Sequence, residues 1–312
     1  MKFDLNILNP PFQEPLKKEA KGGSRGKDLW DKFAKDAITA TKDGGHVAII
    51  LPCMWRKPDA EMYPIISQYQ VEYIEMHAAK KHGGTDYREV GINIFGVWTA
   101  FDCIILHKVP YYKPTLVNDF SGKQHEIDLR EWPWLPGGQF SCIKKILAKK
   151  NDKKCEIIFS QSAYETRKEW MSKTETKCEI IYSRSAYGSD KKWMSKTETK
   201  KYKYPCFHAN KKGGGFNYWY SSRNDKGHFG ISKVIFSDGG YIRPYNDYKG
   251  EYGMTQHAMA IPISSKKEGE LICKALNSDK FKKIVWATKW SGYQTAWTMF
   301  TYFKKDFWKY FV

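Results

Sequence analysis

The stretch Phe3-Asp4-Leu5-Asn6-Ile7-Leu8-Asn9-Pro10-Pro11-Phe12 decides the fold expected for this chain, because a predicted strand ends in it at two consecutive prolines. Each proline fixes its own φ and lacks a backbone donor, and a residue that precedes a proline is driven out of the helical region. Asn9 and Pro10 are therefore expected to be extended. Their side-chain and backbone carbonyl oxygens then form two acceptors that suit a substrate NH2 group, beside an aromatic ring, Phe12, that can stack on a flat base.

The tetrapeptide Asn9-Pro10-Pro11-Phe12 resembles the motif (Asn/Asp/Ser)-Pro-Pro-(Tyr/Phe/Trp) of the amino-group DNA methyltransferases, in the form of their gamma-type, TaqI-like, adenine-specific branch. The resemblance implies transfer of a methyl group from S-adenosyl-L-methionine to the exocyclic amino group of adenine. It also implies that Asn9, Pro10, Pro11 and Phe12 are the catalytic residues, with Phe12 stacked on a base rotated out of the duplex. A second aromatic wall is expected from Phe95 or Trp98.

A second segment, Gly44-Gly45 followed by the apolar run 46–51 and Pro52, resembles the part of the same enzymes that follows their catalytic motif. A continuous apolar run is typical of a strand covered on both faces. Around this segment the hydrophobic pattern predicts a helix over residues 30–41, with Asp28 as N-cap and Gly44-Gly45 as its end. Further along it predicts a helix over 60–69, a strand over 71–77 and a strand pair over 91–107.

This order of elements predicts an α/β fold, the second half of a Rossmann-like methyltransferase sheet with an antiparallel terminal strand pair. In the family, a cofactor-binding half precedes the catalytic motif, whereas only eight residues precede Asn9 here. Residues 211–215, Lys-Lys-Gly-Gly-Gly, lack the spaced glycines of a nucleotide loop. The S-adenosyl-L-methionine site is therefore expected to be incomplete, and no residue is assigned to it. A truncated or split gene product, a second chain that supplies this half, and a domain that no longer methylates all remain open.

Two domains are expected: a partial catalytic domain over residues 1–112 and a mixed α+β, β-rich target-recognition domain over residues 113–312. The second region is rich in Lys, Tyr, Trp, Gly and Ser. Its succession of a strand at 233–237, Leu276-Asn277-Ser278 and the Lys-Trp-Ser-Gly-Tyr segment 289–293 resembles the target-recognition domain of TaqI-like enzymes.

A tandem duplication lies inside this region. The segment 155–177 is followed at once by a near-identical copy over 178–200, a period of 23 residues that gives the duplicated region 155–200. Two copies are too few for a solenoid. A surface insertion and a duplicated DNA-contact element are both compatible with the sequence.

The charge of the chain points to a polyanionic partner. Lys and Arg together number 52 against 34 Asp and Glu, a formal net charge of +18. Such an excess favours phosphate contacts, and double-stranded DNA is the expected partner. Arginines in Gly-rich turns can read guanine, and lysines near Tyr187 and Trp193 can hold phosphates. The candidate DNA-binding residues are Arg184, Lys191, Lys192, Lys211, Lys212, Arg223, Arg243 and Lys289.

Other features limit the class of protein. The seven cysteines form no Cys-x-x-Cys pair, which argues against a zinc site and a disulfide framework. His208, His228 and His257 are too scattered for metal-ligand spacing, so no metal is expected. No apolar run reaches about eighteen residues and no secretion signal is present. A soluble, cytoplasmic protein without membrane contact is expected, in a bacterial, phage or viral context.

Three functions fit these observations. The first is a site-specific adenine-N6 DNA methyltransferase chain. The second is a non-catalytic DNA sequence-recognition module or subunit of a restriction-modification system. The third keeps the catalysis but changes the substrate to RNA or a protein glutamine. A fused restriction nuclease is not expected, because no convincing Pro-Asp…Glu-x-Lys cluster is present.

Overall fold

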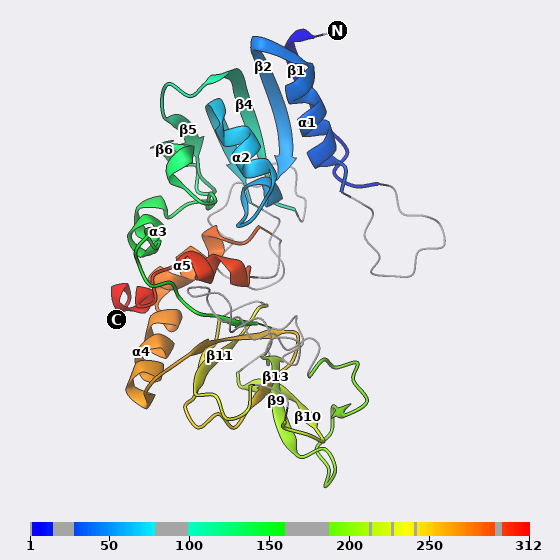
Figure 1. Ribbon diagram of the computed structural model, residues 1–312, viewed down its shortest axis with the longest axis vertical. Helices are drawn as coiled ribbons and strands as arrows, with labels where there is room; N and C mark the ends of the chain where they lie inside the picture. Colours follow the sequence, from blue (N-terminus) through cyan, green and yellow to red (C-terminus); the bar gives the residue numbers. More distant parts are fainter. Residues whose placement is uncertain are drawn as a thin grey trace. The chain divides into compact units, whose positions relative to one another are not determined.

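The chain divides into two compact units, each described by itself below (Figure 1). The first unit comprises Met1–Gln139 and Trp286–Gly292, and the second comprises Phe140–Val285 and Tyr293–Val312. The computed structural model describes residues 2–14, 28–78, 99–159, 187–211, 214–225, 228–239, 242–290 and 295–312. The boundary after Gln139 differs from the one expected after residue 112, because the strands that follow residue 112 continue the sheet of the first unit.

The first unit contains a six-stranded sheet with the strand order β1-β2-β4-β3-β5-β6. Its strands are β1 (Phe3–Leu8), β2 (Thr41–Pro52), β3 (Tyr69–His77), β4 (Phe101–Pro110), β5 (Thr115–Asn118) and β6 (Gln124–Ile127). β1 is parallel to β2 and β3 is parallel to β5, whereas β4 runs antiparallel to both β2 and β3. β6 closes the order antiparallel to β5. The structure thus confirms an α/β fold whose sheet contains both parallel and antiparallel strand pairs. Of the strand pair expected over 91–107, residues 91–98 lie outside the described residues.

The helices of the first unit are α1 (Trp30–Ala40), α2 (Met62–Ser67) and the 3-10 helices η1 (Cys53–Arg56) and η3 (Leu129–Glu131). In Figure 1, α1 and α2 lie in front of the strands. The buried residues of α1 recur at helical spacing, as the sequence predicts, and are Trp30, Ala34, Ala37 and Ile38. Asp28 is not the N-cap. Leu29 holds that position without a side-chain cap, because the Asp28 carboxylate instead accepts a hydrogen bond from Gln13 Nε2 at 3.2 Å.

The glycine pair at 44–45 lies inside β2 and does not end a helix, contrary to expectation. Gly44 has a φ of 81°, a conformation that side chains disfavour. A Cβ on Gly45 would lie 2.8 Å from the backbone oxygen of Asp4 in the neighbouring strand. The pair therefore permits an irregular start of β2, at the place where the β1–β2 register shifts between Phe3 and Leu5.

The two faces of this sheet differ. On one face Val47, Ile49 and Leu51 are buried, together with Ile104 and Leu106 of β4. Asn6 of β1 pairs with Val47, so the Asn6 side chain lies on the same face. It donates to Thr41 Oγ1, directly after the end of α1, which indicates that α1 packs on this face. On the opposite face several apolar side chains are exposed, namely Phe3, Leu5, Ile7 and Ile105.

The second unit contains two four-stranded sheets, with orders β13-β9-β10-β8 and β12-β11-β14-β7. The strands are β7 (Ile158–Phe159), β8 (Met194–Ser195), β9 (Tyr204–Asn210), β10 (Phe216–Ser221), β11 (Lys233–Ser237), β12 (Tyr245–Asp247), β13 (Gly253–Met254) and β14 (Ala258–Pro262). β11 has the bounds expected for the strand at 233–237. Its five residues are all buried.

The helices of the second unit are α3 (Phe140–Ile146), α4 (Lys266–Asn277), the 3-10 helices η5 (Trp297–Tyr302) and η6 (Phe307–Tyr310), and most of α5 (Asp279–Ala287). The N-cap of α4 is Ser265, whose Oγ accepts from Glu268 N, and Glu268 Oε2 accepts in return from Ser264 N, one residue before the cap. Ser278 ends α4 and accepts from Phe281 N, so it also starts α5. The predicted mixed, β-rich character of this region is confirmed.

The duplicated region is described at residues 155–159 and 187–200. In the second copy, Tyr187 and Met194 are buried with Cys206 in one hydrophobic cluster. Tyr187 also packs edge-on against Phe229, with ring centroids 5.4 Å apart. This part of the second copy thus belongs to the core of the unit and is not a surface insertion.

Candidate functional site

The expected catalytic tetrapeptide lies directly after β1, at the end where Leu8 pairs with Ile49 of β2. Asn9 and Pro11 are exposed, Pro10 is buried and Phe12 is half-buried. Burial of the ring of Pro10 anchors the bend, while the exposed Asn9 amide remains accessible to a ligand. The arrangement provides hydrogen-bond acceptors at an open sheet end.

The exit from this bend is tied to the start of α1. Leu29 N donates to Phe12 O at 3.1 Å, and Gln13 forms an isolated antiparallel bridge with Asp28. These bonds fix the backbone on the far side of the prolines. The bend is therefore held at both ends, by strand pairing before it and by this bridge after it. The expected second aromatic wall, Phe95 or Trp98, lies outside the described residues.

The expected DNA-binding residues that the structure describes are divided between the two units. Lys289 belongs to the first unit, whereas Lys191, Lys192, Lys211, Arg223 and Arg243 belong to the second. Arg184 and Lys212 lie outside the described residues. Arg243 donates from Nη1 to the backbone oxygen of Lys211 at 3.2 Å, so the structure brings these two together.

Arg223 is held by an acidic neighbour and an aromatic ring. Its guanidinium binds both carboxylate oxygens of Asp225 and lies 5.3 Å from the centroid of the Trp193 ring. A bidentate carboxylate partner occupies the donors that would contact guanine. In this conformation the Arg223 guanidinium is bound within the loop after β10, and the two donors that Asp225 holds are not available to a guanine base.

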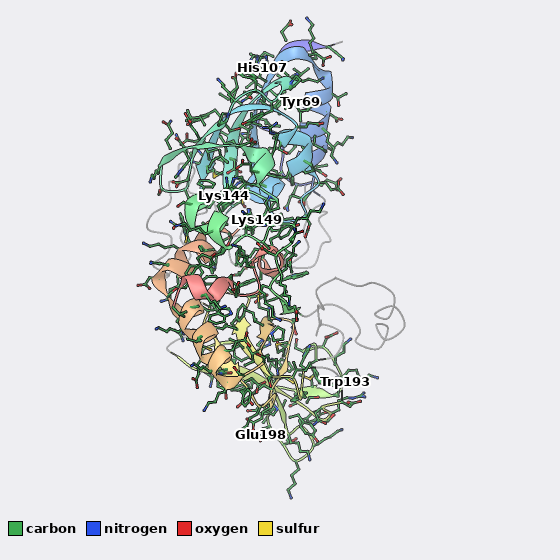
Figure 2. The ribbon with its side chains drawn as sticks, turned by 60° about the vertical axis from the view of Figure 1, so that its left-hand side comes forward. Tyr69, His107, Lys144, Lys149, Trp193 and Glu198 are labelled. Atoms are coloured by element: carbon green, nitrogen blue, oxygen red, sulfur yellow. The ribbon has the colours of Figure 1, made fainter. Side chains whose placement is uncertain are left out.

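Basic and aromatic side chains meet on the sheet that contains β8 and β10. Trp193 and Trp219 are both half-buried, and Lys196 Nζ lies 5.6 Å from the centroid of the Trp219 ring. Lys192, the residue before Trp193, is exposed. Figure 2 labels Trp193 and, in the same unit, Glu198. We call this group, Lys192, Trp193, Lys196 and Trp219, the Trp193/Trp219 surface. Cations next to partly exposed rings suit a nucleic-acid strand, through phosphate contacts and stacking.

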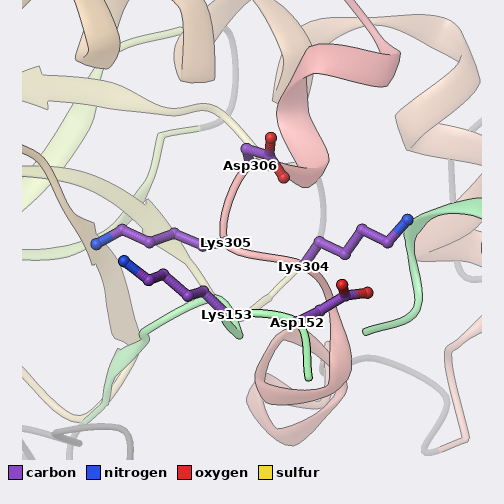
Figure 3. Close-up of a pocket in the computed structure, with 5 residues that line it drawn as sticks. All are labelled: Asp152, Lys153, Lys304, Lys305 and Asp306. Carbon is purple, nitrogen blue, oxygen red and sulfur yellow. The ribbon is translucent and has the colours of Figure 1, made fainter. Parts of the chain in front are cut away.

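A pocket of about 280 Å³ in the second unit was not anticipated from the sequence. It is lined by Asp152, Lys153, Lys304, Lys305 and Asp306. Figure 3 shows the side chains of Lys153 and Lys305 running alongside each other, while Lys304 points the opposite way. The two segments are joined by a hydrogen bond of 2.6 Å from Lys305 N to Lys153 O.

The charge of this pocket is positive overall. Its carboxylates have partners of their own, since Asp152 accepts from Lys149 N at 2.9 Å and Asp306 lies 3.2 Å from Lys309 Nζ. The three lysines therefore favour a small anion such as a phosphate group. The only sequence signal for it is the basic composition of two segments about 150 residues apart.

Comparisons of sequence give no match, neither to a protein-family model nor to a curated protein. Solved structures with similar parts include restriction-modification proteins. The modification subunit of a putative type I restriction enzyme from Vibrio vulnificus YJ016 is 13% identical over 38% of this chain and 25% of its own, with a TM-score of 0.26. The type I methyltransferase subunit from Streptococcus thermophilus is 18% identical over 42% and 30%, with a TM-score of 0.27.

A third similar structure covers more of this chain. The type IIL restriction-modification enzyme MmeI, in complex with DNA, is 8% identical over 88% of this chain and 42% of its own, with a TM-score of 0.42. The chain therefore spans less than half the length of each of these proteins. Among the described residues, no helix has the length and apolar character needed to cross a membrane.

Proposed function

We propose that this chain is part of a site-specific adenine-N6 DNA methyltransferase that uses S-adenosyl-L-methionine. The observation that carries the proposal is an exposed Asn9 next to a buried Pro10, at the end of β1 in a sheet whose neighbouring strands are β2, the antiparallel β4 and β3. A mixed sheet with a parallel β1–β2 pair and an antiparallel β4 is compatible with the partial methyltransferase sheet that the resemblance implies. The β-rich second unit, with its Trp193/Trp219 surface, would be the target-recognition domain.

The bend would supply the groups that bind the target amine, and the cofactor would supply the methyl group. The Asn9 side-chain oxygen and the Pro10 carbonyl would accept hydrogen bonds from the adenine NH2 group, which leaves its nitrogen lone pair directed away from the protein. Phe12, half-buried after the second proline, would stack on the base. Pro11 would keep Pro10 extended, so both acceptors stay aligned.

The described residues do not fit the cofactor on their own. β1 is followed by Asn9 and two prolines, and β2 ends at Pro52 and leads into η1, so neither strand leads into a Gly-rich turn and an α-helix. β1 is also an outer strand of the sheet, and its side chains Phe3, Leu5 and Ile7 are exposed. An open edge with apolar side chains is a surface for strand addition. We therefore propose that the cofactor-binding half adds to β1, from a second chain or from another part of the same protein, and derive no step through the cofactor.

The proposal is tested by transfer of a radiolabelled methyl group from S-adenosyl-L-methionine to mixed-sequence duplex DNA. The assay is run with this chain alone and with candidate partner chains encoded beside it. Label is expected on adenine, and Asn9→Ala is expected to remove it without weakening DNA binding. Lys35→Ala, on the exposed side of α1, is a matched control that should retain activity. Transfer that persists in Asn9→Ala, or that favours matched RNA or a protein glutamine, would contradict the proposal.

A second candidate is a non-catalytic DNA-recognition module of a restriction-modification system. The poor fit of the described residues to the cofactor favours it. The two candidates are separated by calorimetry. A module binds DNA with or without any partner chain but never binds S-adenosyl-L-methionine, whereas the methyltransferase binds the cofactor once its second chain is present.

A further inference from the structure

Three side chains from three adjacent strands meet on the half-exposed face of the first sheet. They are His46 of β2, Glu72 of β3 and His107 of β4, and one ligand atom of each lies within 4.8 Å of the others. We propose that they form a binding site for a divalent transition-metal ion of the zinc class. This site is independent of the proposed methyl transfer and uses none of its residues.

The strand register brings the two histidines together. His46 and His107 are direct partners in the antiparallel β2–β4 pairing, so their side chains leave the sheet on the same face. The imidazole rings stack with centroids 4.3 Å apart and planes inclined by 11°. In Figure 2, His107 lies at the same end of the sheet as Tyr69, the first residue of β3.

Strand register also places the carboxylate on this face. Val71 pairs with Leu106 on the buried face, so the alternation of side chains along β3 places the next residue, Glu72, on the face of His107. Tyr73 pairs with Ile105, so Glu72 is an extra residue in β3 and shares this face with Tyr73 at a β-bulge. Glu72 therefore lies beside the histidine pair, on the face opposite the buried core.

The distances suit an ion better than direct hydrogen bonds. Glu72 Oε2 lies 3.8 Å from His46 Nε2, and Glu72 Oε1 lies 3.8 Å from His107 Nδ1. Both distances exceed those of hydrogen bonds. The ligands of a tetrahedral zinc ion are roughly 3.3 Å apart, as its 2.0–2.1 Å bonds require. Small side-chain rotations would thus bring the three atoms around one ion.

The environment of His107 supports this assignment. Its Nδ1 atom is shielded from solvent and has no hydrogen-bond partner within the described part of the chain. A shielded nitrogen without a partner is costly unless something binds it. The His46 side chain is 40% exposed and that of Glu72 is 31% exposed, so solvent can reach the remaining coordination positions. Two imidazoles and one carboxylate favour zinc, cobalt or nickel over magnesium or calcium.

The experiment is a titration of the metal-free chain with Zn²⁺, followed by calorimetry and thermal melting, and a parallel titration with Co²⁺ followed by visible absorption. One equivalent is expected to bind and to raise the melting temperature, and a chelator should reverse the rise. His46→Ala, His107→Ala and Glu72→Gln are each expected to abolish this binding. Glu75→Gln is a matched control on the same strand, since Glu75 already accepts from Tyr73 and Asn118.

Cysteine thiols also bind Zn²⁺ and Co²⁺, so the assay must distinguish metal bound by thiols from metal bound by His46, Glu72 and His107. Burial raises the pKa of the Cys103 thiol, which disfavours the thiolate that binds metal. Cys103→Ser is therefore expected to bind like the parent chain, and the cobalt spectrum should lack a thiolate charge-transfer band. Circular dichroism checks that each variant is folded. Binding that survives Glu72→Gln in a folded variant, or that disappears in Cys103→Ser, would overturn the proposal. Neither result bears on methyl transfer, because no DNA or cofactor is present.

Discussion

The guanidinium of Arg56 and the carboxylate of Asp102 form a buried ion pair in the first unit, with Nε–Oδ2 and Nη2–Oδ1 distances of 2.7 and 3.1 Å. Neither side chain is exposed. Trp55 Nε1 donates to the same carboxylate, and Arg56 Nη1 donates to Leu135 O. The two charges therefore compensate each other, and the hydrogen bonds of the pair connect η1, β4 and the backbone at Leu135.

Removal of one partner from this pair should destabilise the first unit strongly. Asp102→Ala leaves the Arg56 charge buried and uncompensated, so a loss of about 3–5 kcal/mol in the free energy of unfolding is expected. Urea titration at neutral pH measures it. Glu61→Ala, which removes an exposed pair with Lys35 at 3.4 Å, should lose about 1 kcal/mol or less. Equal losses in the two variants would show that burial does not determine the effect.

His228 should make the stability of the chain depend on pH. Burial lowers the pKa of this imidazole to about 3, and the nearby Lys233 acts in the same direction. Below about pH 6.5 the His228 imidazole is protonated in the unfolded state, whereas in the folded state it stays neutral down to about pH 3. Stability contributed by neutral His228 is therefore complete above pH 6.5 and falls by about 1.4 kcal/mol per pH unit below it.

His228→Asn isolates this contribution. Asn cannot be protonated and tolerates the positive φ of 79° at this position. Urea titrations of both chains between pH 7.5 and 5 should show a smaller fall in the variant, because carboxylate protonation affects both chains alike. Parallel pH profiles would contradict the assignment.

Gly45→Ala should weaken the contact between β1 and β2. A Cβ there would lie 2.8 Å from the Asp4 backbone oxygen, which cannot move without disturbing the pairing. A loss of about 1–3 kcal/mol is expected. Gly44→Asn is the control, since a Cβ at residue 44 meets nothing within 4 Å and Asn tolerates positive φ. Thermal melting of both variants distinguishes crowding from a general intolerance of substitution.

The Trp193/Trp219 surface should contribute to DNA affinity, if the proposed function holds. The double variant Lys192→Ala, Lys196→Ala is expected to weaken binding to all duplex sequences alike. The slope of log affinity against log salt should become less steep by about 0.9 for each lost phosphate contact. Fluorescence anisotropy across a salt series measures both effects. Lys283→Ala, an exposed lysine of α5, should leave affinity and slope unchanged.

The sequence by itself determined the elements whose signals are local. Prolines at 10 and 11 end β1, the helical spacing of Trp30, Ala34 and Ala37 predicts α1, and the apolar run after residue 45 predicts the core of β2. These features depend on backbone sterics and on burial of one face, which neighbouring residues decide. The expectation of an acceptor pair at Asn9 and Pro10 depends on the same local signal and stays a prediction.

Only the tertiary structure decided what depends on pairing between distant strands. Trp286–Gly292 belongs to the first unit, so Lys289 is in a different unit from the other basic candidates that the structure describes, and β5 and β6 extend the first sheet beyond residue 112. The approach of His46 to His107 and the place of Glu72 on the same face both follow from strand register. Side chains in a sheet alternate with a period of two, so a shift of one residue would separate all three, and no local pattern encodes that register.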